Sequence, residues 1–289
     1  MVQLVLLKGR FLMSTKTNKK SGSRLLTFLL VIFIVIFIAA AVNIGRILYN
    51  YKKGDNFYSD TRSKYTADTV PSSDTEGSVQ PEVIPEPGFL VNFAELKATN
   101  PDIVGWICIP NTPVDYPIMF SGNDDTYLRH TYTKEYNVFG SIFISEDCGT
   151  DLSAQHTIIY GHNTKNGAMF GSLKKYKDAA YFNDHPYIYI MMPGMTYKYR
   201  IISAFTTNTY TDVYQITYTD TDTFCSWYNN VLKASVINTD AQPASGQEKV
   251  LSLSTCTSRT KTERFVVNAV LESSYTCPSI TSSSETLSR

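Results

Sequence analysis

The stretch KVLSLSTCTSRTKTERFVVNAVL, residues 249–271, contains two strand-like runs joined by a polar segment. In the first run, apolar and small polar residues alternate, which is typical of a strand with one face in a core. Cys256 ends this run on its less apolar face, and Arg264 opens the second run. A hairpin over the seven polar residues 257–263 would place the two on neighbouring strand ends. The stretch therefore predicts an antiparallel pair with a thiol beside a guanidinium group.

Six more strand-like runs precede this pair, and turn residues separate them. They are rich in Val, Ile, Tyr and Phe, residue types that favour strands. The runs are residues 103–110, 114–120, 140–146, 156–162, 187–192 and 197–205. Eight strands at this spacing predict a mostly β fold, an eight-stranded closed or nearly closed barrel.

Three segments have apolar residues at three- and four-residue intervals, which predicts helices. One lies in residues 89–102, where Asn100-Pro101 disfavours a continuing helix. The others are residues 169–185 and residues 221–238, the latter just before the strand that ends at Cys256. We therefore expect one helix at the start of the domain and another before the cysteine strand.

The run LLTFLLVIFIVIFIAAAVNI, residues 25–44, contains no charged residue. At about 1.5 Å per residue it is long enough to cross a hydrocarbon layer of about 30 Å. A cleaved signal peptide is the alternative, because three alanines occupy positions 39–41, but its apolar region usually has only about 7–15 residues. Six basic residues and no acidic residue precede the run, so the positive-inside rule places the N-terminus in the cytoplasm. The sequence predicts a retained single-pass anchor with the rest of the chain outside the cell.

The chain is expected to have five segments. Residues 1–24 form a basic cytoplasmic leader, in which Met13 is an alternative start to Met1, and residues 25–45 form the transmembrane helix. Residues 46–88 turn polar and rich in Ser, Thr, Asp and Pro, which predicts an extracellular linker. The folded domain covers residues 89–272. Residues 273–289 have no core-forming pattern and are expected to be a disordered tail.

Composition argues against two classes of site. The 26 basic and 26 acidic residues balance, so the chain has no overall field to attract nucleic acid. All five cysteines are expected outside the cell, where disulfides can form, but an odd number leaves at least one thiol without a partner in this chain. No cysteine lies in a C-x-x-C pair, and no His is at zinc-ligand spacing. A metal site has little support, and one reactive thiol is expected.

A cation beside a thiol lowers its pKa and can stabilise charge on a carbonyl oxygen, as acyl transfer requires. Of the four histidines, His162 is the best candidate base, because it closes a strand just after Gly161 and precedes a loop. A Cys-His pair lets a thiolate attack and an imidazolium protonate the leaving amine. Without further information, a lone His at a strand end, such as His162, is more often a surface or capping residue than a catalytic base. A free Cys is commonly a small buried hydrophobe.

The remaining candidates have ordinary interpretations. Cys108 and Cys225 lie in apolar surroundings and are expected to be buried, whereas Cys148 and Cys277 lie in polar segments and are expected to be exposed. The other three histidines, His130, His156 and His185, are expected at the surface or in turns. Arg259 is the rival of Arg264, but it falls inside the predicted hairpin loop.

Three segments resemble motifs of the sortases, and they occur in the order of that family. IIYGHN (residues 158–163) is similar to the His motif, LSTC (253–256) to the T-L-x-T-C motif, and ERFVV (263–267) to the Arg motif. Similarity extends across residues 89–271, and the predicted helices in residues 89–102 and 221–238 resemble class B sortases in particular. One departure is Ser252, where the family motif usually has Thr.

The resemblance implies an eight-stranded sortase barrel and a membrane-anchored cysteine transpeptidase without a cofactor. Cys256 would be the nucleophile, His162 the acid/base and Arg264 the oxyanion-stabilising cation. Such an enzyme cleaves secreted proteins at a C-terminal sorting signal after a Thr, forms a thioacyl intermediate, and passes the chain to a peptidoglycan amine. The resemblance also implies four substrate-binding residues, each of which could equally be ordinary packing: Ser254, Leu128, Thr209 and Tyr214.

Two other functional classes remain open. A hydrolytic cysteine peptidase of the same architecture would use the same Cys, His and Arg. Peptidase and transpeptidase differ only in whether water or an amine attacks the acyl enzyme. An inert binding module is disfavoured, since it gives no reason for these three residues to occur together at strand ends.

Overall fold

The computed structural model describes residues 21–68, 86–257 and 260–277. The chain divides into two units, Met1–Tyr49 and Asn50–Arg289, and each is described by itself. In chain order the elements are α1 (Ser21–Tyr65), β1 (Thr66–Asp68), β2 (Phe89–Val91), α2 (Phe93–Thr99), β3 (Ile103–Cys108), β4 (Asp115–Met119), β5 (Ile142–Ile144), β6 (His156–Tyr160), η1 (Gly171–Lys177), α3 (Ala179–Asp184), β7 (Tyr187–Met192), β8 (Met195–Asn208), η2 (Asp212–Tyr214), α4 (Thr221–Lys233), β9 (Val250–Cys256) and β10 (Glu263–Thr276).

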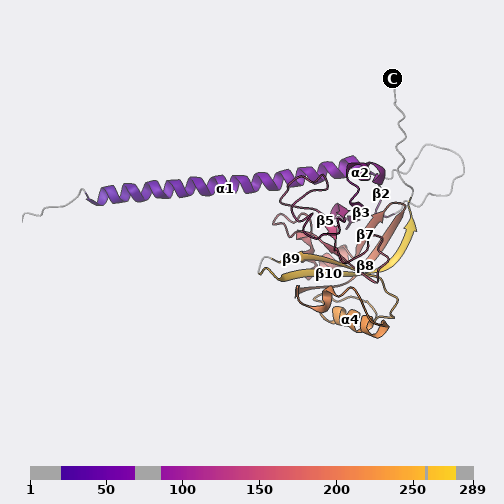
Figure 1. The fold of residues 1–289 in the computed structure, drawn as a ribbon. Helices are drawn as coiled ribbons and strands as arrows, with labels where there is room; N and C mark the ends of the chain where they lie inside the picture. The colour runs from indigo at the N-terminus through magenta and orange to yellow at the C-terminus, as the bar shows by residue number, and fades with distance from the viewer. Residues whose placement is uncertain (1–20, 69–85, 258–259, 278–289) are drawn as a thin grey trace, which may run out of the picture. The chain divides into compact units, whose positions relative to one another are not determined.

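Eight strands form a closed barrel in the order β10-β8-β7-β3-β4-β5-β6-β9 (Figure 1). Each of the eight predicted runs contributes one of these strands, so the predicted barrel is confirmed. Most neighbours are antiparallel, but β4 pairs with β5 and β6 pairs with β9 in parallel. The β6–β9 pairing is what brings the strand before His162 beside the strand that ends at Cys256.

Both faces of β9 are buried, each against a different part of the core. Leu251 and Leu253 face the main barrel core, while Val250 packs in a cluster that includes Phe224 and Trp227 of α4. Helix α4 begins at its N-cap Asp220, whose side chain accepts the Thr223 N–H, and it buries residues at positions 224, 227, 228 and 231. This spacing is one helical stripe. Helix α4 therefore covers the face of β9 that also carries Ser252 and Ser254.

One helix among the described residues, Arg24–Tyr65, is long and apolar enough to cross a membrane. Apolar side chains from Leu25 to Leu48 are exposed along it. A helix that is apolar all round and exposed is typical of a membrane span. The helix is therefore a candidate anchor.

The predicted linker is wrong in its first part. Helix α1 continues without interruption to Tyr65, and residues from Asn50 onward belong to the same unit as the barrel. Tyr58 is buried, and its hydroxyl donates to the Gly140 carbonyl. At Gly54, an added Cβ would lie 2.8 Å from the Phe139 ring, which shows how closely the helix packs. Residues 69–85 of the predicted linker lie outside the described residues.

The predicted tail also begins too early. Strand β10 pairs with β8 as far as Thr276 opposite Met195, so residues 273–276 belong to the barrel. The helix expected in residues 89–102 is confirmed as α2, although the residues before it form β2. Residues 278–289, the leader 1–20 and Arg259 lie outside the described residues.

Two expectations about single side chains are wrong. Cys148 is buried rather than exposed, because the connection between β5 and β6 folds back onto the barrel core, where the Ile158 N–H donates to its sulfur. His156 is fully buried rather than at the surface, because the Trp227 ring covers it at a centroid distance of 4.4 Å. Cys108 is buried as expected, and Cys225 and Cys277 are half-buried.

The buried His156 predicts a loss of stability in acid. Burial lowers the pKa of His156 from 6.5 to about 4, whereas in the unfolded chain it keeps its ordinary value. Between pH 6.5 and pH 4 the unfolded state therefore binds more protons, so the free energy of unfolding falls as the pH falls, by about 3 kcal/mol in total.

Chemical denaturation of wild-type protein and His156→Gln at pH 7, 5 and 4 measures this loss. The difference between the two proteins should shrink by about 3 kcal/mol over the range, because other titrating groups contribute equally to both. A difference that stays constant with pH would mean that His156 titrates normally in the folded protein.

Candidate active site

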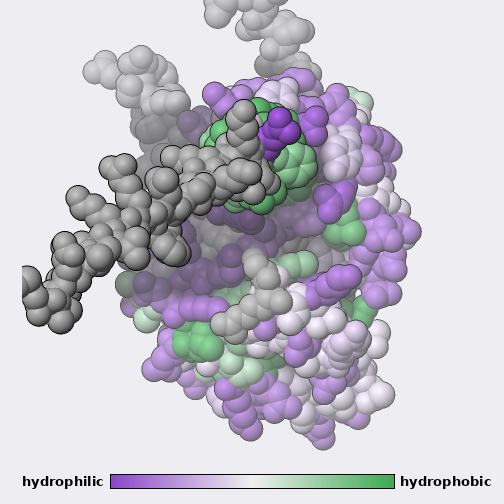
Figure 2. Space-filling view, turned by 90° about the vertical axis from the view of Figure 1, so that its left-hand side faces the viewer, coloured by the Kyte–Doolittle hydropathy of each residue, from purple (hydrophilic) through white to green (hydrophobic). Residues whose placement is uncertain are grey.

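The hairpin of β9 and β10 places Cys256 directly opposite Arg264. Residues paired in this way have Cα atoms about 4.5–5.5 Å apart and side chains on the same face of the sheet. Cys256 is exposed at the end of β9, while the six residues before it are buried. The register of β9 and β10 therefore brings the Cys256 thiol and the Arg264 guanidinium close together, as predicted. Figure 2 views the molecule from the side to which these strand ends point, where the coloured surface is mainly hydrophilic.

Strand β6 brings His162 to the same end of the barrel. Tyr160 pairs with Ser254, and the Gly161 N–H donates to the Ser254 carbonyl at 3.2 Å. A Cβ at Gly161 would lie 2.5 Å from the Ile142 side chain and 2.6 Å from the Phe170 ring, so a larger residue would have to displace both core side chains. His162 follows immediately and leaves the barrel beside the end of β9.

One pocket of about 350 Å³ contains every residue predicted for the site. Its lining includes the three residues predicted to carry chemistry and the four predicted to bind substrate. They are Cys256, His162, Arg264, Ser254, Leu128, Thr209 and Tyr214. Segments from four separate parts of the chain thus converge on one cavity.

His162 forms a hydrogen bond from Nε2 to the Leu128 carbonyl at 2.5 Å. A carbonyl can only accept, so Nε2 carries the proton and Nδ1 is the basic nitrogen of the neutral ring. Burial lowers the pKa of His162 below its ordinary value, and the positive charge of Arg129 lowers it further, while the Leu128 bond acts in the opposite direction. A neutral imidazole at pH 7 is able to accept a proton.

Arg264 is held by its own turn in this structure. Its Nη1 donates to the Lys261 carbonyl at 2.8 Å and to the Glu263 carbonyl at 3.2 Å. Across the pocket, the Tyr214 hydroxyl and Ser254 Oγ lie 2.9 Å apart. Burial raises the pKa of Tyr214, and the nearby charge of Arg264 partly offsets this effect. The guanidinium therefore acts electrostatically on groups that line the pocket.

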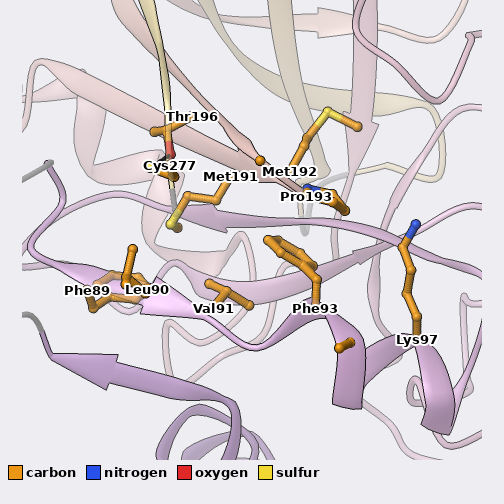
Figure 3. A pocket seen from close by; sticks show the side chains of 12 residues that line it. Phe89, Leu90, Val91, Phe93, Lys97, Met191, Met192, Pro193, Thr196 and Cys277 are labelled. Atoms are coloured by element: carbon orange, nitrogen blue, oxygen red, sulfur yellow. Dashed lines mark hydrogen bonds between the residues drawn. The ribbon is translucent and has the colours of Figure 1, made fainter. Parts of the chain in front are cut away.

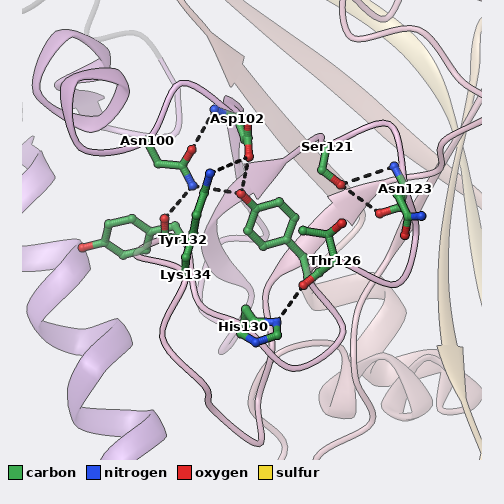
Figure 4. A network of polar contacts seen from close by, with 9 residues as sticks. Asn100, Asp102, Ser121, Asn123, Thr126, His130, Tyr132 and Lys134 are labelled. Carbon is green, nitrogen blue, oxygen red and sulfur yellow. Dashed lines mark hydrogen bonds and ion pairs between the residues drawn. The ribbon is translucent and has the colours of Figure 1, made fainter.

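The segment that carries Leu128 is fixed by a network of polar contacts (Figure 4). The Tyr127 hydroxyl donates to Asp102 at 2.6 Å, and the Asn100 amide donates to the Tyr132 carbonyl at 2.7 Å. Lys134 forms an ion pair with Asp102 at 3.5 Å. The Leu128 side chain is exposed into the pocket while its neighbour Tyr127 is buried. These contacts thus hold the loop around Leu128 in a defined conformation, although it contains no helix or strand.

Five residues that line the pocket were not predicted from the sequence: Asp124, Phe143, Tyr160, Gly161 and Thr255. Tyr160 had a signal, because strand periodicity puts it on the same face as His162 two residues later. Asp124 lies in a loop without periodicity, so no sequence pattern indicated it. Burial raises the pKa of its carboxyl group, which is the negative charge nearest to the site among the described lining residues.

A second pocket of about 300 Å³ lies between β2, α2 and the turn from β7 to β8 (Figure 3). Phe89, Val91, Phe93 and Met191 give it an apolar lining. It also contains Cys277, whose sulfur lies 3.0 Å from Thr196 Oγ1. Among the described residues its lining contains no histidine and shares no residue with the pocket at Cys256. It therefore lacks the base that thiol chemistry needs.

The geometry of the Cys256 pocket suits acyl transfer. A thiol, a basic imidazole nitrogen and a guanidinium line the same cavity, and the strand pairing fixes two of the three relative to each other. These are the nucleophile, proton carrier and oxyanion donor that a covalent acyl intermediate requires.

Comparison with known proteins agrees with this geometry. The family described as Sortase domain matches residues 107–272. The sortase B of Listeria monocytogenes is 33% identical over 224 residues, which cover 76% of this chain and 85% of that protein. The sortase B of Staphylococcus aureus is 27% identical over 164 residues, 57% of this chain and 67% of that protein.

Solved structures show the same fold. The sortase B of Bacillus anthracis superposes with a TM-score of 0.64 at 26% identity, covering 78% of this chain and 98% of that chain. A sortase B–substrate complex from Staphylococcus aureus gives a TM-score of 0.59 at 27% identity, covering 62% of this chain and 84% of that chain. With its barrel, its Cys-His-Arg pocket and these relatives, the chain belongs to the sortase family of cysteine transpeptidases and is of the sortase B type.

Proposed function

We propose that this sortase cleaves secreted proteins at a C-terminal sorting signal after a Thr, and transfers them to a cell-wall amine through a thioacyl intermediate at Cys256. The observation that carries the proposal is the pairing of Cys256 with Arg264 at the rim of a pocket that His162 also lines. The solved relatives include a sortase B–substrate complex and a sortase B complexed with triglycine.

In the first half of the reaction, His162 takes the proton of the Cys256 thiol, and the resulting thiolate attacks the carbonyl carbon of the substrate Thr. Negative charge develops on the carbonyl oxygen, where Arg264 stabilises it by directional hydrogen bonds. The C–N bond then breaks as the His162 imidazolium gives its proton to the leaving amine. The products are a thioester at Cys256 and the released C-terminal fragment.

In the second half, an acceptor amine attacks the thioester. His162 takes the proton of the attacking amine, the C–S bond breaks, and the Cys256 thiolate is regenerated. The basic Nδ1 of the neutral imidazole suits this step, because burial keeps the pKa of His162 below its ordinary value.

Four residues are proposed to hold the sorting signal. Leu128 presents an exposed apolar side chain to the pocket, and Thr209 and Tyr214 approach it from the segment after β8. Ser254 Oγ lies 2.9 Å from the Tyr214 hydroxyl. Ser254 precedes the nucleophile Cys256 by two residues, so its hydroxyl is placed to orient the scissile carbonyl. Tyr214 and Ser254 thus form one wall of the proposed groove.

The proposed location is the cell membrane, with the N-terminus in the cytoplasm and the catalytic domain outside. The candidate span in α1 and the basic residues before it support this orientation. A domain held there would meet secreted substrates and peptidoglycan amines, its proposed partners.

The competing function is hydrolysis by a cysteine peptidase of the same architecture. A soluble chain of residues 50–289, given a peptide with Pro in second place and Thr before the cut, should cleave after Thr and accumulate a thioester at Cys256. A wall-peptide amine should then speed product release and capture the acyl group, because a transpeptidase site positions an amine better than water.

Mass spectrometry of the products decides between the two functions. Ligated peptide that increases with amine concentration supports the transferase. Free acid alone at saturating amine, without a gain in rate, would establish the peptidase instead. A Cys256→Ala chain serves as the control, because any product it forms is not enzymatic.

A further inference from the structure

A chain of buried polar side chains crosses the strands that end at the catalytic pocket. His156 of β6 contacts Ser252 of β9 between Nε2 and Oγ at 2.7 Å. Ser252 Oγ lies 2.6 Å from the side-chain oxygen of Asn268 in β10, and the Asn268 amide donates to Ser203 of β8 at 2.9 Å. The exposed fraction of each of these four residues is 1% or less. The chain therefore links four adjacent strands through direct side-chain contacts.

The chain lies on the same sheet face as the catalytic residues. Ser252 pairs with Asn268, just as Cys256 pairs with Arg264 four residues further along. At about 3.3 Å per residue, the two pairs are about 13 Å apart along the strands. The polar chain is thus too distant to touch a reacting group, and any effect on catalysis must act through position.

The other nitrogen of His156 leads to the substrate side of the pocket. Nδ1 lies 2.7 Å from the Gln215 carbonyl, which follows Tyr214 in the chain. A carbonyl only accepts, so Nδ1 of the neutral ring carries the proton. The neutral form fits the burial of the ring, which keeps the pKa of His156 at about 4.

The surroundings of the ring hold it in this orientation. Trp227 packs over it, and Trp227 Nε1 in turn donates to the Asp212 carbonyl at 2.8 Å. The titratable side chain that faces the ring is Tyr218, whose hydroxyl lies 3.3 Å from Nδ1 and donates to Gln215 at 2.8 Å. Both contacts bind the segment between β8 and α4, which has only the short η2 as regular structure.

We propose that His156 is a positioning residue for substrate binding, which holds the Gln215 backbone so that Tyr214 reaches Ser254. This inference rests on the proposed function only in assigning Tyr214 and Ser254 to the substrate groove. Loss of the Nδ1 bond should let the segment 209–217 move away from β9. The thiol, imidazole and guanidinium stay in place, so the effect falls on KM rather than on kcat.

Two isosteric amides separate the two nitrogens of His156. His156→Asn retains a donor near the position of Nδ1, whereas His156→Gln retains a polar group near Nε2 and loses the bond to Gln215. In full-length enzyme in detergent, His156→Gln should raise KM for the substrate peptide about tenfold with kcat changed less than threefold. His156→Asn should restore KM to within about threefold of wild type. Equal KM values in both variants would overturn the inference.

Hydrogen–deuterium exchange tests the same bond without substrate. Amides of residues 209–217 should exchange about tenfold faster in His156→Gln than in His156→Asn, and equal exchange would overturn the inference even if the protein proved inactive. If the Gln variant does not fold, long-range ¹H–¹⁵N spectra of wild-type protein at pH 7 remain decisive. They should show His156 protonated on Nδ1, assigned by substituting the other three histidines, and the Nε2 tautomer would contradict it.

These readouts separate the inference from the proposed function. Absent cleavage by wild-type protein would contradict the function, while exchange and tautomer still report on His156. Active enzyme with unchanged exchange in His156→Gln would contradict only the inference.

Discussion

Cys256→Ala is expected to abolish cleavage of a sorting-signal peptide and leave the unfolding temperature nearly unchanged. The thiol carries the covalent step, and the described lining of the pocket contains no second cysteine that could form the thioester. Cys256 is also exposed at the end of β9 and outside the buried clusters, so its sulfur contributes little to packing. Steady-state cleavage and thermal unfolding of wild-type and variant protein measure the two effects.

Cys277→Ala is the matched control for Cys256→Ala. Cys277 is also a free thiol and is half-buried, but it lines the separate apolar pocket and has a threonine rather than a base beside it. Its replacement should leave cleavage unchanged. Wild-type cleavage by Cys256→Ala, or loss of cleavage in Cys277→Ala, would place the nucleophile elsewhere.

The barrel was predictable because strand periodicity is a local property. In the stretch around Cys256, Leu251 and Leu253 alternate with serines, and this alternation survives in the structure as two distinct faces. The sequence could not show that the serine face is buried as well. That depends on α4, which covers it from a different part of the chain.

The continuation of α1 beyond residue 45 differs from the linker that the sequence predicts. Residues 46–65 are mostly polar, and this composition favoured a linker. Tyr51, Tyr58 and Tyr65 are nevertheless seven residues apart, which is two helical turns, so they form one stripe along the helix. Tyr58 and Tyr65 are buried against the domain. The signal was present, but three aromatic positions are too few to outweigh composition.

The buried His156 could not have been predicted from its own strand. A histidine that opens a strand is compatible with the surface, and His156 is buried only because Trp227 and Tyr218 from the α4 region pack over it. By contrast, all seven predicted site residues meet in one pocket. Cys256 and Arg264 lie at paired strand ends, and His162 follows the end of β6. Leu128, Thr209 and Tyr214 lie in connections between strands, and only the resemblance indicated them.

His162 and Arg264, the proposed acid/base and oxyanion donor, both bind backbone carbonyls in this structure. His162 donates to Leu128, and Arg264 donates to Lys261 and Glu263. A substrate carbonyl oxygen would compete with the latter carbonyls for the guanidinium. The site is therefore held in a defined resting arrangement from which Arg264 can turn toward a developing oxyanion.

Arg264→Lys is expected to be nearly as damaging as Arg264→Ala. A planar guanidinium presents its nitrogens as a rigid fork and can therefore make two parallel, directional hydrogen bonds to one group. A Lys ammonium keeps the charge but not this fork, so it should not hold the oxyanion in the required direction. Removing one oxyanion donor costs about 10²–10³ in rate, and the loss should appear in kcat, because the charge exists only in the transition state.

Arg259→Ala is the matched control, since it removes a guanidinium five residues before Arg264, from the connection between β9 and β10. Pre-steady-state measurement of thioester formation should show acylation slowed by about 10²–10³ in both Arg264 variants and unchanged in Arg259→Ala. Full activity in Arg264→Lys would mean that charge alone suffices, so that Arg264 acts on the thiol rather than on the oxyanion. Loss in Arg259→Ala instead would show that the cation opposite Cys256 in the register is not the one that the reaction uses.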